Sequence, residues 1–217
     1  MFNFSKFLRI IGLKKQPQIA SMEALEAFID ENAAFVSQVS LYTYVKARAG
    51  TSFPKMFENE NFLISLSISR WHIYTASVSD LALFSAAQFQ GSGFADLTEC
   101  QAITTYLGTR ILSKVEQNDV DQSVFDQAAT RLKKRAKTAD FLNPDEGKKY
   151  FTNSSDAFMQ WAPVVDEFKA QDEEIMRNSM HLRWIGIRQE LKERLKHDKT
   201  FADWIMITNT AKFSAKR

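Results

Sequence analysis

The chain is short of cysteine, histidine, proline and glycine, and these shortages exclude several classes of structure and site. Seven glycines and four prolines among 217 residues provide few of the turns that a many-stranded sandwich or barrel requires. The single cysteine, Cys100, excludes an internal disulfide and a metal site with several thiolate ligands, and it fits a reducing compartment. Helical structure is therefore the favoured prediction.

The chain is rich in apolar residues, and its positive and negative charges are nearly equal in number. Hydrophobic residues make up 45% of the sequence, which is enough to bury a sizeable core. The 28 basic residues nearly cancel the 26 acidic ones, so the molecule as a whole is not expected to bind nucleic acid electrostatically. The basic run RLKKRAK at 131–137 is more typical of a solvated helix face than of a phosphate-binding patch, and nucleic acid is not predicted as a partner.

Apolar residues recur at intervals of three and four along most of the chain, which predicts helices. Ser21 is the predicted N-cap of a long helix that stops at Gly50, and Asp96 with Glu99 forms the capping box of a helix extending to about residue 117. The apolar segment 62–89 carries small residues on one face and is predicted to be the central helix of a bundle. Further helices are predicted at 124–136, 143–146, 155–196 with a break near Pro163, and 200–209.

These helices predict an all-α, single-domain irregular bundle of about six or seven helices. The bundle is expected over 18–210, preceded by a basic amphipathic segment at 1–17 and followed by a polar tail at 211–217. No internal repeat and no break in composition divides the core into two domains.

The motifs of familiar enzymes are missing from the sequence. None of the three histidines follows a glutamate by three residues, and none belongs to a His-Glu-x-x-His pattern, so no metal site is predicted. Ser92 in QGSGF lacks the spacing of a hydrolase elbow, and Cys100 is better explained by core packing than as a nucleophile. No Walker loop or dinucleotide fingerprint occurs. We therefore predict no catalytic residue and no cofactor.

A short block at 45–81 contains an Ala-Arg-Ala-Gly run, then Phe-Glu, then Ser-Arg-Trp. Through Arg48, Gly50, Phe57, Arg70 and Trp71 this block resembles part of a group of small bacterial helical proteins of unassigned function. Members of such groups are sometimes labelled esterases, an activity that no residue pattern in this chain supports.

The alternative to a non-catalytic protein is a helical small-molecule-binding protein or enzyme with a pocket between the first two long helices. Arg48, Arg70, His72 and Asp80 are its candidate ligand-binding residues, and the last three interrupt the most apolar segment of the chain. If Arg48 and Arg70 share one space, their guanidinium groups suit a bidentate clamp on a carboxylate or another anion.

The first fifteen residues, MFNFSKFLRIIGLKK, combine large apolar side chains with basic ones and contain no acid. Three interpretations stay open: contact with an anionic membrane surface, packing onto the domain, and an organellar presequence. A second amphipathic stretch at 181–196 either completes the core or docks a partner helix or a membrane surface. The residues expected to contact a membrane or a partner are Phe4, Phe7, Leu8, Ile11, Lys14, Lys15 and Trp184.

These observations predict a non-catalytic interaction or adaptor protein with a protein partner. We expect it in the cytoplasm, peripheral on a membrane through its N-terminal segment. An organellar matrix reached by presequence import is the alternative location.

Overall fold

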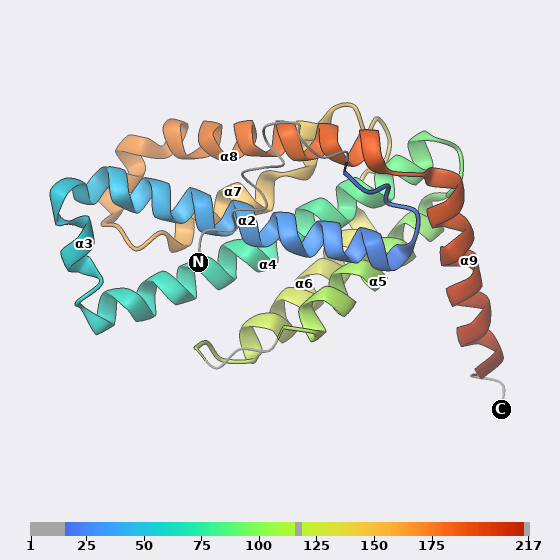
Figure 1. The fold of residues 1–217 in the computed structure, drawn as a ribbon, viewed down its shortest axis with the longest axis horizontal. Helices are drawn as coiled ribbons and strands as arrows, with labels where there is room; N and C mark the ends of the chain where they lie inside the picture. The colour runs from blue at the N-terminus through green and yellow to red at the C-terminus, as the bar shows by residue number, and fades with distance from the viewer. Residues whose placement is uncertain (1–15, 116–118, 215–217) are drawn as a thin grey trace.

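Helices account for nearly all the regular structure in the computed structural model, which describes residues 16–115 and 119–214 (Figure 1). Seven helices in these ranges have ten residues or more, and the only β pairing there is a single parallel bridge between Ile19 and Leu195. The predicted all-α fold of six or seven helices is confirmed. In chain order the elements are α2 (Met22–Ala49), η1 (Gly50–Ser52), α3 (Phe53–Met56), α4 (Glu60–Gly91), α5 (Leu97–Ser113), α6 (Ser123–Thr138), η2 (Gly147–Tyr150), α7 (Thr152–Trp161), α8 (Asp166–Arg194) and α9 (His197–Ser214).

Helix α4 lies at the centre, with α2, α5, α6 and α7 packed around it (Figure 1). Every residue from Ser77 to Phe89 is buried, as expected for a helix that is surrounded on all sides. The prediction of a central helix over 62–89 is therefore confirmed. The first turns of α4 are different, because Ile64 and Ser65 are exposed there.

Local capping signals set the starts of α2 and α5 as the sequence predicts. The Ser21 side chain accepts a hydrogen bond from the backbone N–H of Ala24. The Asp96 carboxylate accepts from the N–H of Glu99, whose carboxylate accepts from the N–H of Asp96, which completes the capping box. Gly50 follows α2 with a φ of 52°, a left-handed conformation that glycine adopts at little cost.

The segment 143–150 corrects one helix prediction. Instead of starting a helix, Pro144 and Asp145 form a turn, closed by a hydrogen bond from the N–H of Glu146 to the carbonyl oxygen of Asn143. Asn143 has a positive φ of 53°, which interrupts helical geometry, and the 3-10 helix η2 begins only at Gly147. Two helix ends also differ from the prediction. Helix α5 ends at Ser113 instead of at about residue 117, and α9 continues to Ser214 instead of ending at residue 209.

The described chain begins at the junction of α8 and α9. Ile19 is buried, its N–H donates to the carbonyl oxygen of Arg194, and its own carbonyl accepts from the N–H of Lys196. The hydroxyl of Thr200 donates to the same carbonyl. Residue 16 is therefore held close to the end of α8, where Arg194 also donates to the carbonyl oxygen of Pro17.

Candidate functional site

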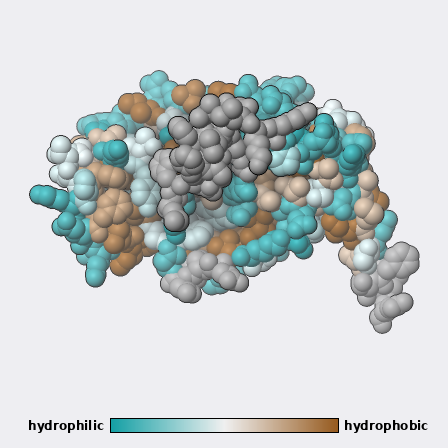
Figure 2. Space-filling view, in the orientation of Figure 1, coloured by the Kyte–Doolittle hydropathy of each residue, from teal (hydrophilic) through white to brown (hydrophobic). Residues whose placement is uncertain are grey.

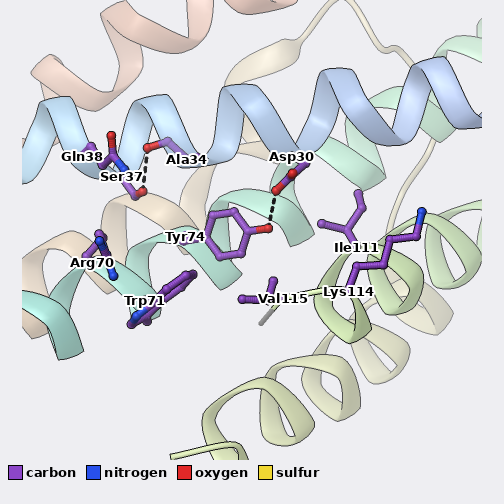
Figure 3. Close-up of a pocket in the computed structure, with 10 residues that line it drawn as sticks. All are labelled: Asp30, Ala34, Ser37, Gln38, Arg70, Trp71, Tyr74, Ile111, Lys114 and Val115. Atoms are coloured by element: carbon purple, nitrogen blue, oxygen red, sulfur yellow. Dashed lines mark hydrogen bonds between the residues drawn. The ribbon is translucent and has the colours of Figure 1, made fainter. Parts of the chain in front are cut away.

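A cavity of about 250 Å³ opens between α2, α4 and α5 (Figure 3). It lies between the first two long helices, where the sequence places the alternative ligand pocket, and one candidate residue, Arg70, lines it. Its lining residues are Asp30, Ala34, Ser37, Gln38, Arg70, Trp71, Tyr74, Ile111, Lys114 and Val115.

Tyr74 of α4 and Asp30 of α2 form a hydrogen bond at one side of the cavity. The hydroxyl of Tyr74 donates to Oδ1 of Asp30 at 2.5 Å, as Figure 3 shows. Burial, and then the neighbouring Asp30 carboxylate, raise the pKa of Tyr74 well above its ordinary value of 10.0. Tyr74 therefore remains protonated at neutral pH and serves as a hydrogen-bond donor, not as a proton-transfer group.

Arg70 forms a second polar cluster with a residue that follows α5. Its Nη2 atom lies 2.9 Å from the carboxylate of Asp119, which also accepts from Trp71 Nε1 at 2.9 Å and from the Ser67 hydroxyl at 2.5 Å. Burial raises the pKa of Asp119, but these hydrogen bonds and the Arg70 charge outweigh it and leave the pKa below its ordinary value. The buried Nε of Arg70 has no hydrogen-bond acceptor among the described residues.

Two further polar residues of the cavity lining are paired with other groups of the chain. Lys114, the lining amine, pairs with Glu26 at 2.6 Å, and the hydroxyl of Ser37 donates to the carbonyl of Ala34. Among the lining hydroxyls, that of Tyr74 bonds the Asp30 carboxylate and that of Ser37 bonds a backbone carbonyl, and no histidine or cysteine is among the described lining residues.

The other three ligand candidates lie in separate environments. Arg48 pairs with Asp172 of α8 and lies over the Phe168 ring, so Arg48 and Arg70 each neutralise a different carboxylate of the chain and form no joint clamp. His72 stacks on Trp161 with 3.6 Å between ring centroids. The structure therefore does not bring Arg48, Arg70, His72 and Asp80 together.

Asp80 is a fully buried structural anchor. Its Oδ1 accepts from Nη1 of Arg135 at 2.5 Å, and its Oδ2 accepts from the N–H of Ser154 at 2.8 Å. Arg135 also donates to the hydroxyl of Ser79 and to the carbonyl of Tyr150. One carboxylate thus ties α4 to α6, η2 and α7, and it is not open to a ligand.

Trp184 corrects the predicted partner contact on α8. The ring is fully buried, and its Nε1 donates to the hydroxyl of Ser154 at 3.1 Å. Trp184 belongs to the core-facing side of α8, together with Met180 and Leu191, and is unavailable to a membrane or a partner. The other predicted contact residues, Phe4, Phe7, Leu8, Ile11, Lys14 and Lys15, lie outside the described residues.

The outward side of α8 carries a different set of apolar residues, which sequence reasoning missed. Phe168, Ile175 and Leu182 follow each other at seven-residue intervals, and their exposed fractions are 43%, 66% and 67%. Two heptads return to the same face of a helix, so the three side chains form one stripe about 21 Å long. Figure 2 shows apolar side chains along the upper edge of the molecule, where Figure 1 places α8. We call Phe168, Ile175 and Leu182 the α8 stripe.

Acidic residues border the α8 stripe. Glu167 and Glu174 each precede a stripe residue and are also seven residues apart, and Glu193 lies on the same face further along. All three are exposed, and none has an ion-pair partner among the described residues. The stripe is therefore an apolar surface with acidic residues along one side, and the guanidinium of Arg48 lies over its first residue, Phe168.

The described ranges hold neither a metal-binding cluster nor an exposed thiol. No three histidine, cysteine, aspartate or glutamate side chains gather there to hold a metal ion. Cys100 is buried against the carbonyl of Ala86, and burial raises its pKa to about 12, so it packs in the core as a protonated thiol. Nor does any helix in the described ranges combine the length and apolar character needed to cross a bilayer.

Comparison with known proteins adds no further assignment: no family model, curated protein or solved structure matches this chain.

Proposed function

We propose that this protein is a non-catalytic interaction protein that binds an amphipathic helix of a partner along the α8 stripe. The observation that carries the proposal is the exposure of three large apolar side chains, Phe168, Ile175 and Leu182, at heptad spacing on one helix face. Seven-residue spacing is the geometry with which one helix packs on another at a shallow angle. Contiguous exposed apolar side chains of this kind are typical of interaction sites.

The charges around the stripe define the chemistry of the partner. Glu167 and Glu174 have the positions from which flanking charges select a partner helix, and no described cation neutralises them. A helix with lysine or arginine beside its apolar residues therefore complements the surface. The positions between the stripe residues include the polar Gln171 and Asn178, so the interface is expected to be reversible and not permanent.

Two designed peptides test this proposal. Both are amphipathic helices with leucine at seven-residue intervals, flanked by lysine in one and by glutamate in the other. Titrated into isotope-labelled protein, the lysine peptide is expected to shift the amide signals of α8 around Ile175 and Leu182, and the glutamate peptide is not. The double variant I175S/L182S should weaken binding at least about tenfold, because each lost apolar contact removes about 1 kcal/mol or more.

Met206 provides the matched control, since it is an exposed apolar residue of α9 with an exposed fraction of 62%. The variant Met206→Ser should bind the lysine peptide as the unmodified protein does. Equal binding of both peptides, or full binding by I175S/L182S, would refute the proposal. A dimer in sedimentation that I175S/L182S abolishes would assign the stripe to a second copy of the chain and would also refute it.

A further inference from the structure

A second surface pocket, of about 580 Å³, lies between η2, the start of α7 and the C-terminal half of α8. It is a shallow hollow that is largely open to solvent. It is separate from the cavity in Figure 3 and from the α8 stripe. Its lining residues are Asp145, Glu146, Gly147, Lys148, Lys149, Thr152, His181 and Arg188.

The two acids of this pocket are neutralised by lysines. Asp145 pairs with Lys192, and Glu146 lies 3.9 Å from Nζ of Lys149, which also bonds Asp140 at 2.7 Å. Arg188 and Lys148, by contrast, have no carboxylate partner among the described residues. The pocket therefore has positive charge in excess of what its own acids balance.

Arg188 is held in place without an anion. The side chain is half-buried, its guanidinium lies 5.9 Å from the centre of the Phe151 ring, and it rests against Gly147. A Cβ atom at Gly147 would lie 1.7 Å from Nη1 of Arg188, so the absence of a side chain there is what makes room for the guanidinium. A partly desolvated guanidinium without a carboxylate is costly unless a ligand supplies the charge.

The neighbouring groups point to the same ligand charge. His181 precedes Arg188 by seven residues and so lies on the same side of α8. Burial, and then the nearby charges of Arg188 and Lys148, lower the pKa of His181. Thr152 adds a hydroxyl at the first residue of α7.

We propose that this pocket binds the phosphate group of a small phosphorylated molecule, with Arg188 as its bidentate donor and Lys148, His181 and Thr152 as neighbouring donors. A guanidinium fork matches two phosphate oxygens, and a dianion neutralises Arg188 and Lys148 together, which a single carboxylate does not. The remaining volume accommodates the organic part of the ligand. The site does not depend on helix binding by the α8 stripe.

The test uses inorganic phosphate as the probe, titrated at constant ionic strength into the isotope-labelled full chain. Saturable shifts are expected at the amides of Gly147, Lys148 and Thr152, with weaker binding of acetate. Arg188→Gln should raise the Kd by about tenfold or more, because a hydrogen bond to a charged group contributes roughly 1.5–3 kcal/mol. Gly147→Ala keeps every charge but displaces the guanidinium, so it should weaken binding in the same direction.

Arg131→Gln is the matched control, since Arg131 is an exposed arginine without an ion-pair partner among the described residues. It should leave the phosphate Kd within about twofold. Unchanged binding in both Arg188→Gln and Gly147→Ala would overturn the proposal, as would acetate binding as tight as that of phosphate.

A separate experiment measures binding of the protein to vesicles of phosphatidylcholine with phosphatidic acid. Binding to them through Arg188, without binding of free phosphate, would assign the pocket to a lipid headgroup and overturn the small-molecule proposal.

Discussion

At the scale of single residues, the ion pair between buried Asp80 and Arg135 connects several helices and is expected to contribute to stability. Removing one partner of a buried ion pair leaves the other charge uncompensated, which costs about 3–5 kcal/mol. Asp80→Ala should therefore lower the free energy of unfolding in urea by about that amount, because Arg135 and the N–H of Ser154 both lose their acceptor.

Asp145→Ala provides the comparison for this prediction. Asp145 has a side-chain exposure of 91% and pairs with Lys192 on the surface, where an ion pair contributes up to about 1 kcal/mol. A loss in Asp80→Ala no larger than in Asp145→Ala would show that the Asp80 network does not hold the helices together.

His72 gives the molecule a sensitivity to acid. Burial, and then the charge of Arg131, hold the pKa of His72 below its ordinary value of 6.5. The unfolded chain therefore binds a proton more readily than the folded one, and stability is lost as the pH falls below 6.5. His72→Phe keeps a ring against Trp161 but does not titrate. Its free energy of unfolding should fall less steeply than that of the unmodified protein between pH 6.5 and about pH 5.

The variant removes the contribution of only one histidine. Burial also lowers the pKa values of His181 and His197, which remain in the variant. Part of the acid-side decline should therefore persist in His72→Phe. Urea unfolding curves that lose stability with identical slopes in the two proteins would contradict a lowered pKa at His72.

Individual site residues are hard to predict from the sequence because their partners lie on other helices, far away in the chain. Arg70 was identified as a ligand candidate, but Asp30 and Tyr74 beside it were not, because α2 brings Asp30 to the cavity only after the helices pack. The same applies to Asp80, since Arg135 and Ser154 follow it by more than fifty residues. The spacing of residues within one helix does not predict pairs of residues that are so far apart in the sequence.

At the scale of helices, two glycines in helices of the same bundle are expected to respond in opposite ways to alanine. A Cβ at Gly108 of α5 would lie 2.1 Å from a methyl carbon of Leu132 in α6, so Gly108→Ala should force the buried Leu132 side chain out of its packed position. Overpacking of this kind costs about 1–3 kcal/mol. The expected result is a lower free energy of unfolding despite the better helix propensity of alanine.

Gly186 of α8 is the control, because a Cβ there meets no atom within 4 Å. Gly186→Ala should raise the free energy of unfolding by about 0.5–1 kcal/mol through helix propensity alone. If both alanine variants gain stability, the close approach of α5 and α6 at Gly108 is not a constraint on the fold.

Helix positions were predictable where their signals are local, and helix faces were not. The caps at Ser21 and Asp96 act within three residues, and both were read correctly. Helix α8, however, has two periodic apolar faces, one containing Trp184 and the other containing Ile175 and Leu182. Periodicity alone does not say which face is turned inward. The aromatic face was assigned to a partner, whereas the structure buries it.

At the scale of the whole molecule, the start of the described chain is bound to the junction of α8 and α9. The backbone of Ile19 bonds to Arg194 and Lys196, and the N–H of Met22 donates to Asp203 of α9 at 2.7 Å. The start of α2 is thereby attached to the α8–α9 junction (Figure 1). These hydrogen bonds join segments more than 170 residues apart in the sequence, and no local sequence pattern predicts such a contact.

Two shortened chains separate the effect of this contact from that of the segment before it. A chain lacking residues 2–20 loses the buried Ile19 side chain and its backbone bonds, and its free energy of unfolding should fall by about 2 kcal/mol or more. A chain lacking residues 2–15 keeps Gln16, Pro17 and Ile19 and should retain the full free energy of unfolding, as expected if the first fifteen residues act as an appendage. Equal losses in the two chains would instead show that the first fifteen residues pack onto the bundle.

Flotation with anionic vesicles then tests the appendage directly, because the intact chain should float and the chain lacking residues 2–15 should not.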